Sequence, residues 1–238
     1  EMQRSLVGSE MCIRDRYIVF ILALLPMLVH AQSPKKAKWN FNNLEGWVYT
    51  QQDKHPNIQY EISKGKLKMY TRAGSDDRKK MRTKDRIYTT GRYTWRTYIS
   101  EMGKGDQSSI GCWLYCDDKH EIDFEIGPGK DEVRASLNAA HDELIGYMTT
   151  QGNPYHTNTV KIKPGWHIFE IDITLVNGKY KVDWMIDGEV LSSVQQTYGK
   201  EIAFYIFCSV ENLKFLGEHP ATKDNYALFD YVKYKYHD

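Results

Sequence analysis

Three carboxylates stand at alternate positions of one short segment, HEIDFEIG at residues 120–127: Glu121, Asp123 and Glu125. Side chains on a β-strand alternate between two faces, so the acids point one way and the apolar residues between them point the other. The apolar face belongs in a core. Three like charges on one face repel one another and bring no structural gain, which favours a chemical role. Charged alternation on a solvated strand face is the structural alternative.

Short alternating runs make up nearly all of the chain after residue 38 and predict β-strands. The predicted strand regions are 58–72, 91–100, 108–116, 120–127, 132–138, 167–191, 201–210 and 226–237. The segments SKGK, DDKH, PGKD, VNGK and IDGE provide turn signals, and no useful helical period is present. The pattern predicts an all-β, antiparallel sandwich or barrel in one domain.

Several of these segments carry a family resemblance. EIDFE fits the Glu, aliphatic, Asp, hydrophobic, Glu signature of glycoside hydrolase family 16, in the form that looks like that of lichenases and xyloglucan transferases. TTGRYTWR resembles the family's Gly-Arg-aromatic strand, and SSIGCWLYC stands where the family has the strand leading into the catalytic one. WHIFEIDI, KVDWMIDGEVL and ALFDYVKY resemble later strands in the family's order, so the resemblance spans residues 39–236.

The resemblance implies a β-jelly-roll sandwich of the concanavalin A-like kind, whose concave sheet holds a polysaccharide. It also implies that Glu121 is the nucleophile, Glu125 the acid/base and Asp123 the group that tunes their protonation. A retaining pair brings its carboxyl groups to ~5–5.5 Å, whereas the Cα atoms of Glu121 and Glu125 are ~13 Å apart on an extended strand. Retention is therefore implied by the resemblance alone, and paired acids on one face follow from the residues.

Strand parity suggests further cleft residues. The preceding strand shows the cleft either Trp113 and Tyr115 or the set Cys112, Leu114 and Cys116, and the apolar set suits the core. The same parity places Tyr205 and Phe207 on the cleft side and Cys208 in the core. Flat rings there would stack on sugar rings, although burial in the core is the usual fate of a Trp.

A second group of candidate substrate contacts is polar. If residues 132–138 form a strand, Arg134, Ser136 and Asn138 face the cleft, where Arg134 would meet a sulfate or carboxylate or pair with Glu125. His120 stands where close relatives in the family commonly have Asp after a Trp. It is a candidate subsite contact, and an exposed turn histidine is the alternative.

The N-terminal region predicts processing. Residues 1–16 look like a non-native leader, and residues 17–31 predict a secretory signal peptide cut after Ala31, since the apolar run is shorter than the roughly 20 residues of a membrane span. Residues 32–38 look like a linker before a catalytic domain at 39–238. Export leaves Cys112, Cys116 and Cys208, which we expect to be buried thiols; a bridge from Cys208 to either partner stays open.

Composition bears on partners. With 32 Lys and Arg against 31 Asp and Glu, the net charge of +1 gives no field to attract nucleic acid or an anionic membrane. We expect a secreted monomer, extracellular or periplasmic, whose partner is a polysaccharide and which needs no cofactor for catalysis. The resemblance adds a structural calcium, with Asp230 and the backbone of Gly91 at the matching positions.

The combined prediction is an endo-acting glycoside hydrolase that cleaves a β-linked polysaccharide with retention, with transglycosylation as a variant of the same chemistry. The alternative is a sugar-binding lectin on the same sandwich. Both acids of the pair are present, which favours the enzyme. The polysaccharide and its linkage are not predicted by one sequence.

Overall fold

Three tight turns form where a glycine follows Lys64, Asn177 or Asp187. They join β3 (Tyr60–Ser63) to β4 (Lys66–Thr71), β11 (Gly165–Val176) to β12 (Lys179–Ile186), and β12 to β13 (Glu189–Gln195). All six turn residues have φ between 51° and 87°, as the hairpin turn with two left-handed central residues requires. The hairpins predicted from SKGK, VNGK and IDGE are therefore confirmed.

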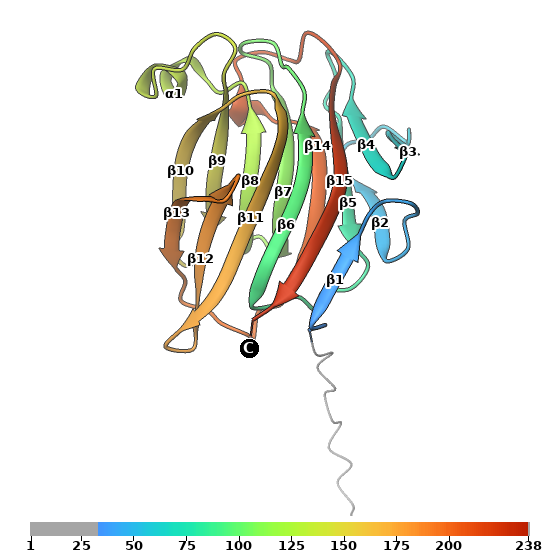
Figure 1. Cartoon of the computed structure of the whole chain (residues 1–238). Helices are drawn as coiled ribbons and strands as arrows, with labels where there is room; N and C mark the ends of the chain where they lie inside the picture. Colours follow the sequence, from blue (N-terminus) through green and yellow to red (C-terminus); the bar gives the residue numbers. More distant parts are fainter. Residues whose placement is uncertain (1–32, 238) are drawn as a thin grey trace, which may run out of the picture. The chain divides into compact units, whose positions relative to one another are not determined.

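The computed structural model describes residues 33–237, which form two antiparallel sheets packed face to face (Figure 1). Sheet A runs β13-β12-β11-β6-β15-β4-β3, with β1 also pairing with β15. Its further strands are β1 (Lys36–Trp39), β6 (Gly91–Ile99) and β15 (Asn225–Tyr236).

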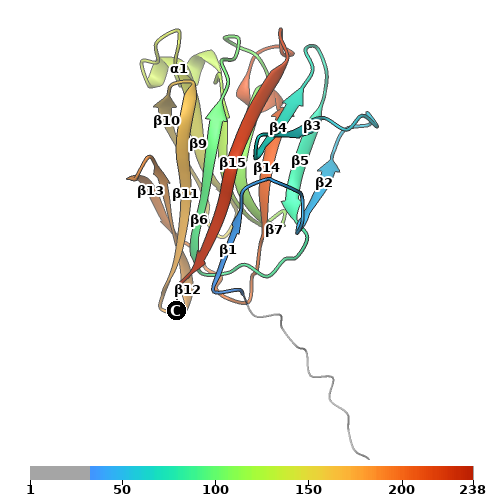
Figure 2. The ribbon, with the colours of Figure 1, turned by 45° about the vertical axis from the view of Figure 1, so that its right-hand side comes forward.

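Sheet B runs β10-β9-β8-β7-β14-β5-β2 and lies behind sheet A in the two ribbon views (Figures 1 and 2). Its strands are β2 (Trp47–Gln51), β5 (Arg78–Thr83), β7 (Ser108–Asp117), β8 (His120–Gly127), β9 (Leu144–Gln151), β10 (Tyr155–Ile162) and β14 (Tyr205–Asn212). The predicted all-β antiparallel sandwich is thus confirmed.

The core between the sheets fixes the backbone of the strands that carry the acids. Trp184 of sheet A donates its indole N–H to the Asp123 carbonyl at 3.0 Å, and Trp95 donates to the Phe207 carbonyl at 3.0 Å. Both indoles are fully buried. A large buried ring whose N–H is hydrogen-bonded contributes apolar burial and leaves no unpaired donor. These two hydrogen bonds therefore tie strands of sheet A to strands of sheet B.

One predicted strand is a helix. Residues Asp131–Ser136 form α1, which follows a turn at Gly129 with φ 76°. Asp131 and Glu132 lie in its first turn and Arg134 in its last, charges that suit the two ends of a helix. The segment PGKD therefore begins a helix instead of reversing a hairpin. A short 3₁₀ helix, η1, covers Lys214–Leu216.

The domain begins earlier than predicted. Lys36–Trp39 form β1, which pairs with β15, so residues 36–38 belong to the sheet and not to a linker. The predicted leader and signal peptide lie outside the described residues. Within residues 33–237, no helix is both long and apolar enough to cross a membrane.

Candidate active site

The three acids lie on the outer face of sheet B. Glu121, Asp123 and Glu125 alternate along β8 with Ile122, Phe124 and Ile126, which are fully buried against sheet A. β8 is the third of seven strands, so it has neighbours on both sides. The parity predicted from the sequence is confirmed.

Strand register identifies what surrounds the acids, because direct cross-strand partners point to the same face. The row through Glu125 contains Thr159, Tyr147, Gly111, Ser209, Lys80 and Thr50. The row through Asp123 contains Thr157, Thr149, Trp113, Phe207 and Arg82. Most of these side chains line one cleft of about 1100 Å³ that also contains all three acids.

Gly111 lies between Glu125 and Ser209 in the first row. A Cβ at this position would collide with the Ser209 hydroxyl and crowd the Trp113 ring at 3.0 Å. The missing side chain therefore leaves room for the Ser209 hydroxyl and the Trp113 ring beside Glu125.

Burial and neighbouring charge keep Glu125 protonated. Loss of solvent has the largest effect on this carboxyl, and the charges of Glu211 and Glu121 act in the same direction. A hydrogen bond from Ser109 and the charge of Lys80 oppose them. The result is a pKa raised to about 8, which suits a group that must donate a proton near neutral pH.

Asp123 and Glu121 influence each other's protonation. Burial, followed by the charges of Glu121 and Glu125, raises the pKa of Asp123 well above its usual range. Burial raises the pKa of Glu121 above its ordinary value, and a hydrogen bond from the protonated Asp123 acts in the opposite direction. Three carboxyl groups on one face thus have different protonation environments, as a pair of catalytic acids requires.

A second charged group faces Glu125 from across β7, and parity on β8 did not predict it. Glu211 is buried on β14 and forms ion pairs with Arg78 at 2.7 Å and with Lys80 of β5. Lys80 is also buried, and its ammonium lies 4.9 Å from the centroid of the Trp113 ring. Glu211 and Lys80 thus form a buried ion pair in the floor of the cleft, and the half-exposed Arg78 pairs with Glu211 beside it.

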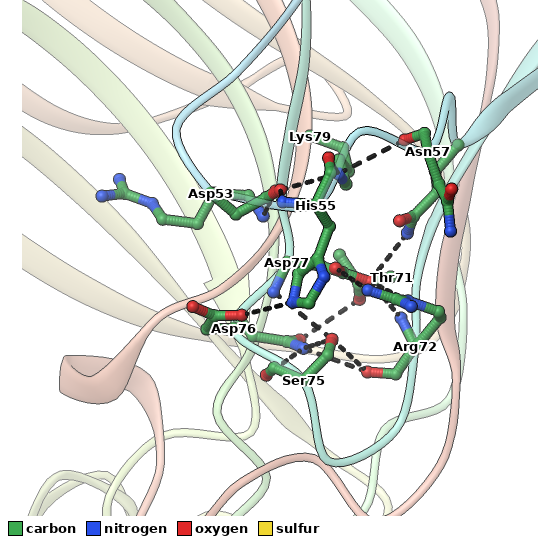
Figure 3. Close-up of polar contacts among 12 residues, drawn as sticks. Asp53, His55, Asn57, Thr71, Arg72, Ser75, Asp76, Asp77 and Lys79 are labelled. Atoms are coloured by element: carbon green, nitrogen blue, oxygen red, sulfur yellow. Dashed lines mark hydrogen bonds and ion pairs between the residues drawn. The ribbon is translucent and has the colours of Figure 1, made fainter.

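A buried polar network supports the same end of the cleft (Figure 3). Lys79, fully buried on β5, donates to Asp53 at 2.9 Å and to the carbonyl oxygens of His55 and Asn57 at 3.2 and 3.4 Å. Asp77 accepts hydrogen bonds from Arg72 at 2.7 Å and from other donors, which hold its pKa far below its usual range although burial acts to raise it. The network fixes the segments before β5 and so positions Arg78 and Lys80.

The predicted aromatic contacts are found in the cleft, with one exception. Trp113 and Phe207 lie stacked with centroids 3.9 Å apart, and Tyr115 meets Trp113 edge to face at 5.9 Å. All three line the cleft. Tyr205 lies on the same face, but its ring is covered by the Arg82 guanidinium at 4.3 Å and is not part of the cleft wall.

Two of the predicted polar contacts are wrong. Arg134 is buried, and it donates to the carbonyl oxygens of Pro128, Ala140 and Glu143 at 2.6 to 2.8 Å, so it holds the α1 loop together. It does not pair with Glu125, and it does not line the cleft. Asn138 follows α1 with φ 50° and lines a separate hollow.

Ser136 does line the cleft, from the helix and not from a strand. The polar wall on that side is instead made by strands β9 and β10, which the sequence did not reveal. Thr149 and Thr157 lie there within 3.2 Å of each other, and Gln151 donates to Asp123 at 3.3 Å.

His120 is neither a cleft residue nor an exposed turn residue. Its ring packs edge to face on Tyr198 at 4.6 Å, and its Nδ1 lies 2.7 Å from Asp117. The bond to Asp117 fixes the turn that leads into β8. His120 therefore supports the catalytic strand without contacting the cleft.

The positions predicted for calcium do not fit that ion. The Asp230 carboxylate forms ion pairs with Arg96 at 2.5 Å and Lys66 at 3.8 Å. Gly91 pairs with Tyr236, six residues further along β15 and roughly 20 Å away at strand rise. No group of three or more His, Cys, Asp or Glu side chains among residues 33–237 is placed to hold a metal ion.

The three cysteines among residues 33–237 are free thiols. Cys112 and Cys208 are cross-strand partners on β7 and β14 and are buried, as predicted, and burial raises the pKa of each. Cys116 is only half-buried, because the register shifts by one residue between Tyr115 and Asp117.

Comparison with known proteins identifies the fold. No family model matches the sequence, and no curated protein does. Among solved structures, a Bacillus licheniformis β-glucanase aligns with a TM-score of 0.62 at 16% identity, covering 87% of this chain and all of its own. A laminarinase from Flavobacterium sp. UMI-01 aligns at 0.58 and 16% identity, covering 84% and 98%.

The Crh5 transglycosylase aligns with a TM-score of 0.64 at 14% identity, covering 86% of this chain and 85% of its own. At such identities the likeness is one of fold. The resemblance to glycoside hydrolase family 16 is confirmed at that level.

Proposed function

We propose that this chain is a secreted, endo-acting glycoside hydrolase that cleaves a β-linked glucan with retention of configuration. The single observation that carries the proposal is the pair Glu121 and Glu125 in one open cleft, with the pKa of Glu125 raised to about 8. The fold shared with proteins called β-glucanase and laminarinase supports the choice of a glucan.

The proposed reaction uses the three acids in sequence. Glu121, ionised and held by the Asp123 hydrogen bond, attacks the anomeric carbon, while Glu125 gives its proton to the leaving oxygen. The bond between the anomeric carbon and that oxygen breaks, and a glycosyl ester of Glu121 remains. Glu125, now ionised, takes a proton from water, which attacks the same carbon and releases Glu121.

Aromatic side chains and hydroxyls would hold the polymer. The half-buried Tyr115 offers a ring for a pyranose in front of the buried stack of Trp113 and Phe207, and Thr149 and Thr157 offer hydroxyls on the opposite side of the acids. A sugar in the second step would replace water as acceptor, which makes transglycosylation a variant of the same mechanism.

Proton NMR of the first products from a soluble β-1,3- or mixed-linkage glucan tests the proposal. We expect the β-anomer to form first, before mutarotation. An initial α-anomer would mean that Glu121 activates water and inverts the centre. Binding of the glucan without release of reducing ends would support the lectin alternative.

A further inference from the structure

Four lysines face each other on strands β1 and β15 of sheet A. The three acids lie on the other sheet. β1 pairs with the lower half of β15, and the two strands lie side by side in both ribbon views (Figures 1 and 2). The register sets Lys36 opposite Lys235 and Lys38 opposite Lys233. We call these four residues the lysine patch.

All four lysines point outward. Ala37 and Tyr234, the alternate partners in the same register, belong to the core, so the lysines are on the outer face. Lys36, Lys38 and Lys235 are exposed and Lys233 is half-buried. Residues of both strands line a shallow hollow of about 430 Å³.

The acids in the cross-strand rows of the patch, Glu170 and Asp172, lie two strands away on β11. Within the described part of the chain, none of the four lysines forms an ion pair, whereas Arg92 on the adjacent strand is paired with Asp172 at 2.9 Å. Like charges directly opposite each other destabilise a strand pair. The protein as a whole has a net charge of only +1, so the patch is a local concentration.

Protection of a sheet edge accounts for only half of this arrangement. Lysines on an edge strand keep other chains from pairing with it, and β1 is such a strand. Lys233 and Lys235, however, lie on β15, which is paired on both sides, with β6 and with β1. Lysines on a paired strand add repulsion without protecting any edge.

An aromatic ring lies within the patch. The ammonium of Lys233 is 4.1 Å from the centroid of Tyr231, and that of Lys38 is 5.8 Å from it. A ring between cations can meet the apolar face of a sugar while the ammonium groups bind its acidic substituents. Among residues 33–237, none of the large exposed apolar side chains is on β1 or β15, so the patch has nothing to insert into a bilayer.

We propose that the lysine patch is a second, non-catalytic binding surface for an acidic polysaccharide, one that carries carboxylate or sulfate groups. This inference rests on the proposed function only in its choice of a polysaccharide over other polyanions. The patch would hold the enzyme on a charged polymer while sheet B acts on a neutral one.

The test compares the native protein with the variant Lys36→Gln/Lys38→Gln/Lys233→Gln/Lys235→Gln in affinity electrophoresis through polygalacturonate, dextran sulfate or neutral laminarin. We expect the native protein to be retarded by the two acidic polymers in a salt-dependent way, and the variant to bind them at least about tenfold more weakly. The control Lys54→Gln/Lys64→Gln/Lys84→Gln/Lys223→Gln loses four lysine charges outside the patch, so its net charge equals that of the patch variant. It should bind the acidic polymers as the native protein does.

Three outcomes would overturn the inference: equal weakening in the control, no retardation of the native protein, or tighter binding to duplex DNA or to phosphatidylglycerol vesicles than to the acidic polymers. Cleavage of a soluble neutral glucan is measured in parallel. Loss of polymer binding with unchanged cleavage supports the patch. A native protein that binds acidic polymers but cleaves no glucan refutes the proposed function and not the patch.

Discussion

Glu211 and Glu125 face one cleft from opposite sides of β7, and the charge of Glu211 helps to keep Glu125 protonated. Lys80 forms an ion pair with Glu211 and acts on Glu125 in the opposite direction. The pKa of the proposed acid/base therefore depends on a buried ion pair whose members lie two and three strands away from β8, on β14 and β5.

Glu121→Gln and Glu125→Gln should each lower kcat by about 10³-fold or more, since each removes a group that acts only in the transition state. Both positions face the cleft, so the fold should persist. Rates on a soluble β-glucan and thermal melts are measured together. An Ile62→Val variant, far from the cleft, serves as a control. Glu121→Gln with most of the native rate would exclude Glu121 as the nucleophile.

The alkaline limb of the pH profile of kcat/KM should lie near pH 8, because it reports loss of the Glu125 proton. Glu211→Gln removes a negative charge, so it should move this limb to lower pH. Lys80→Met removes a positive charge and should move it to higher pH. Shifts in the same direction in both variants would contradict the electrostatic role given to the pair, and a purely structural role would lower rates without moving the limb.

Glu125 should make the protein less stable as the pH rises. Its folded pKa of about 8 exceeds the ordinary value of 4.5, so between these values the folded protein holds a proton that the unfolded chain has released. The free energy of unfolding then falls from about pH 4.5 to about pH 8. Glu125→Gln removes this dependence and should be more stable than the native protein at pH 8 by about 1–3 kcal/mol.

Urea unfolding at pH 4, 6 and 8 measures the effect, and the two proteins should be closest at pH 4. If the stability difference between the native protein and Glu125→Gln is constant across the three pH values, a group other than Glu125 causes the pH dependence.

Arg134→Met should destabilise the protein without affecting substrate binding. The change removes three hydrogen bonds to carbonyl oxygens in the α1 loop and leaves those acceptors without a charged donor. We expect a loss of about 3 kcal/mol and a Tm lower by roughly 6–12 °C. KM for glucan should stay within twofold, whereas a contact with substrate would raise it. Arg134→Lys retains the charge but not the planar guanidinium, so its Tm should lie between those of the native protein and Arg134→Met.

The sequence predicted those features of the fold and the site that depend on residues close together in the chain. The faces of Glu121, Glu125 and Trp113 follow from alternation on one strand, and the turns at Lys64, Asn177 and Asp187 follow from the glycine after each. Residues 132–138 were assigned wrongly because the apolar Val133, Ala135 and Leu137 alternate as in a strand, and a six-residue helix is too short to show its own period.

Contacts between distant segments were not predicted. Lys80 and Glu211 are 131 residues apart in the chain and meet only because β5 pairs with β14. The charge-rich sequence of β5, RKKMRT, has no apolar alternation, and its buried lysines depend on acids from other segments. The register of sheet B therefore had to be known before this part of the site could be identified.

Strand pairs of the sandwich differ in how much chain separates their two members. The β11–β12 and β7–β8 hairpins close through two residues, whereas β7 and β14 join residues 108–117 to residues 205–212, and β1 and β15 join residues 36–39 to residues 232–235. Short loops close at a lower entropic cost and faster than long ones. We expect folding to begin in the two-residue hairpins of both sheets and the distant pairs to form last, so that pulse-labelling hydrogen exchange would protect the amides of β12 before those of β14.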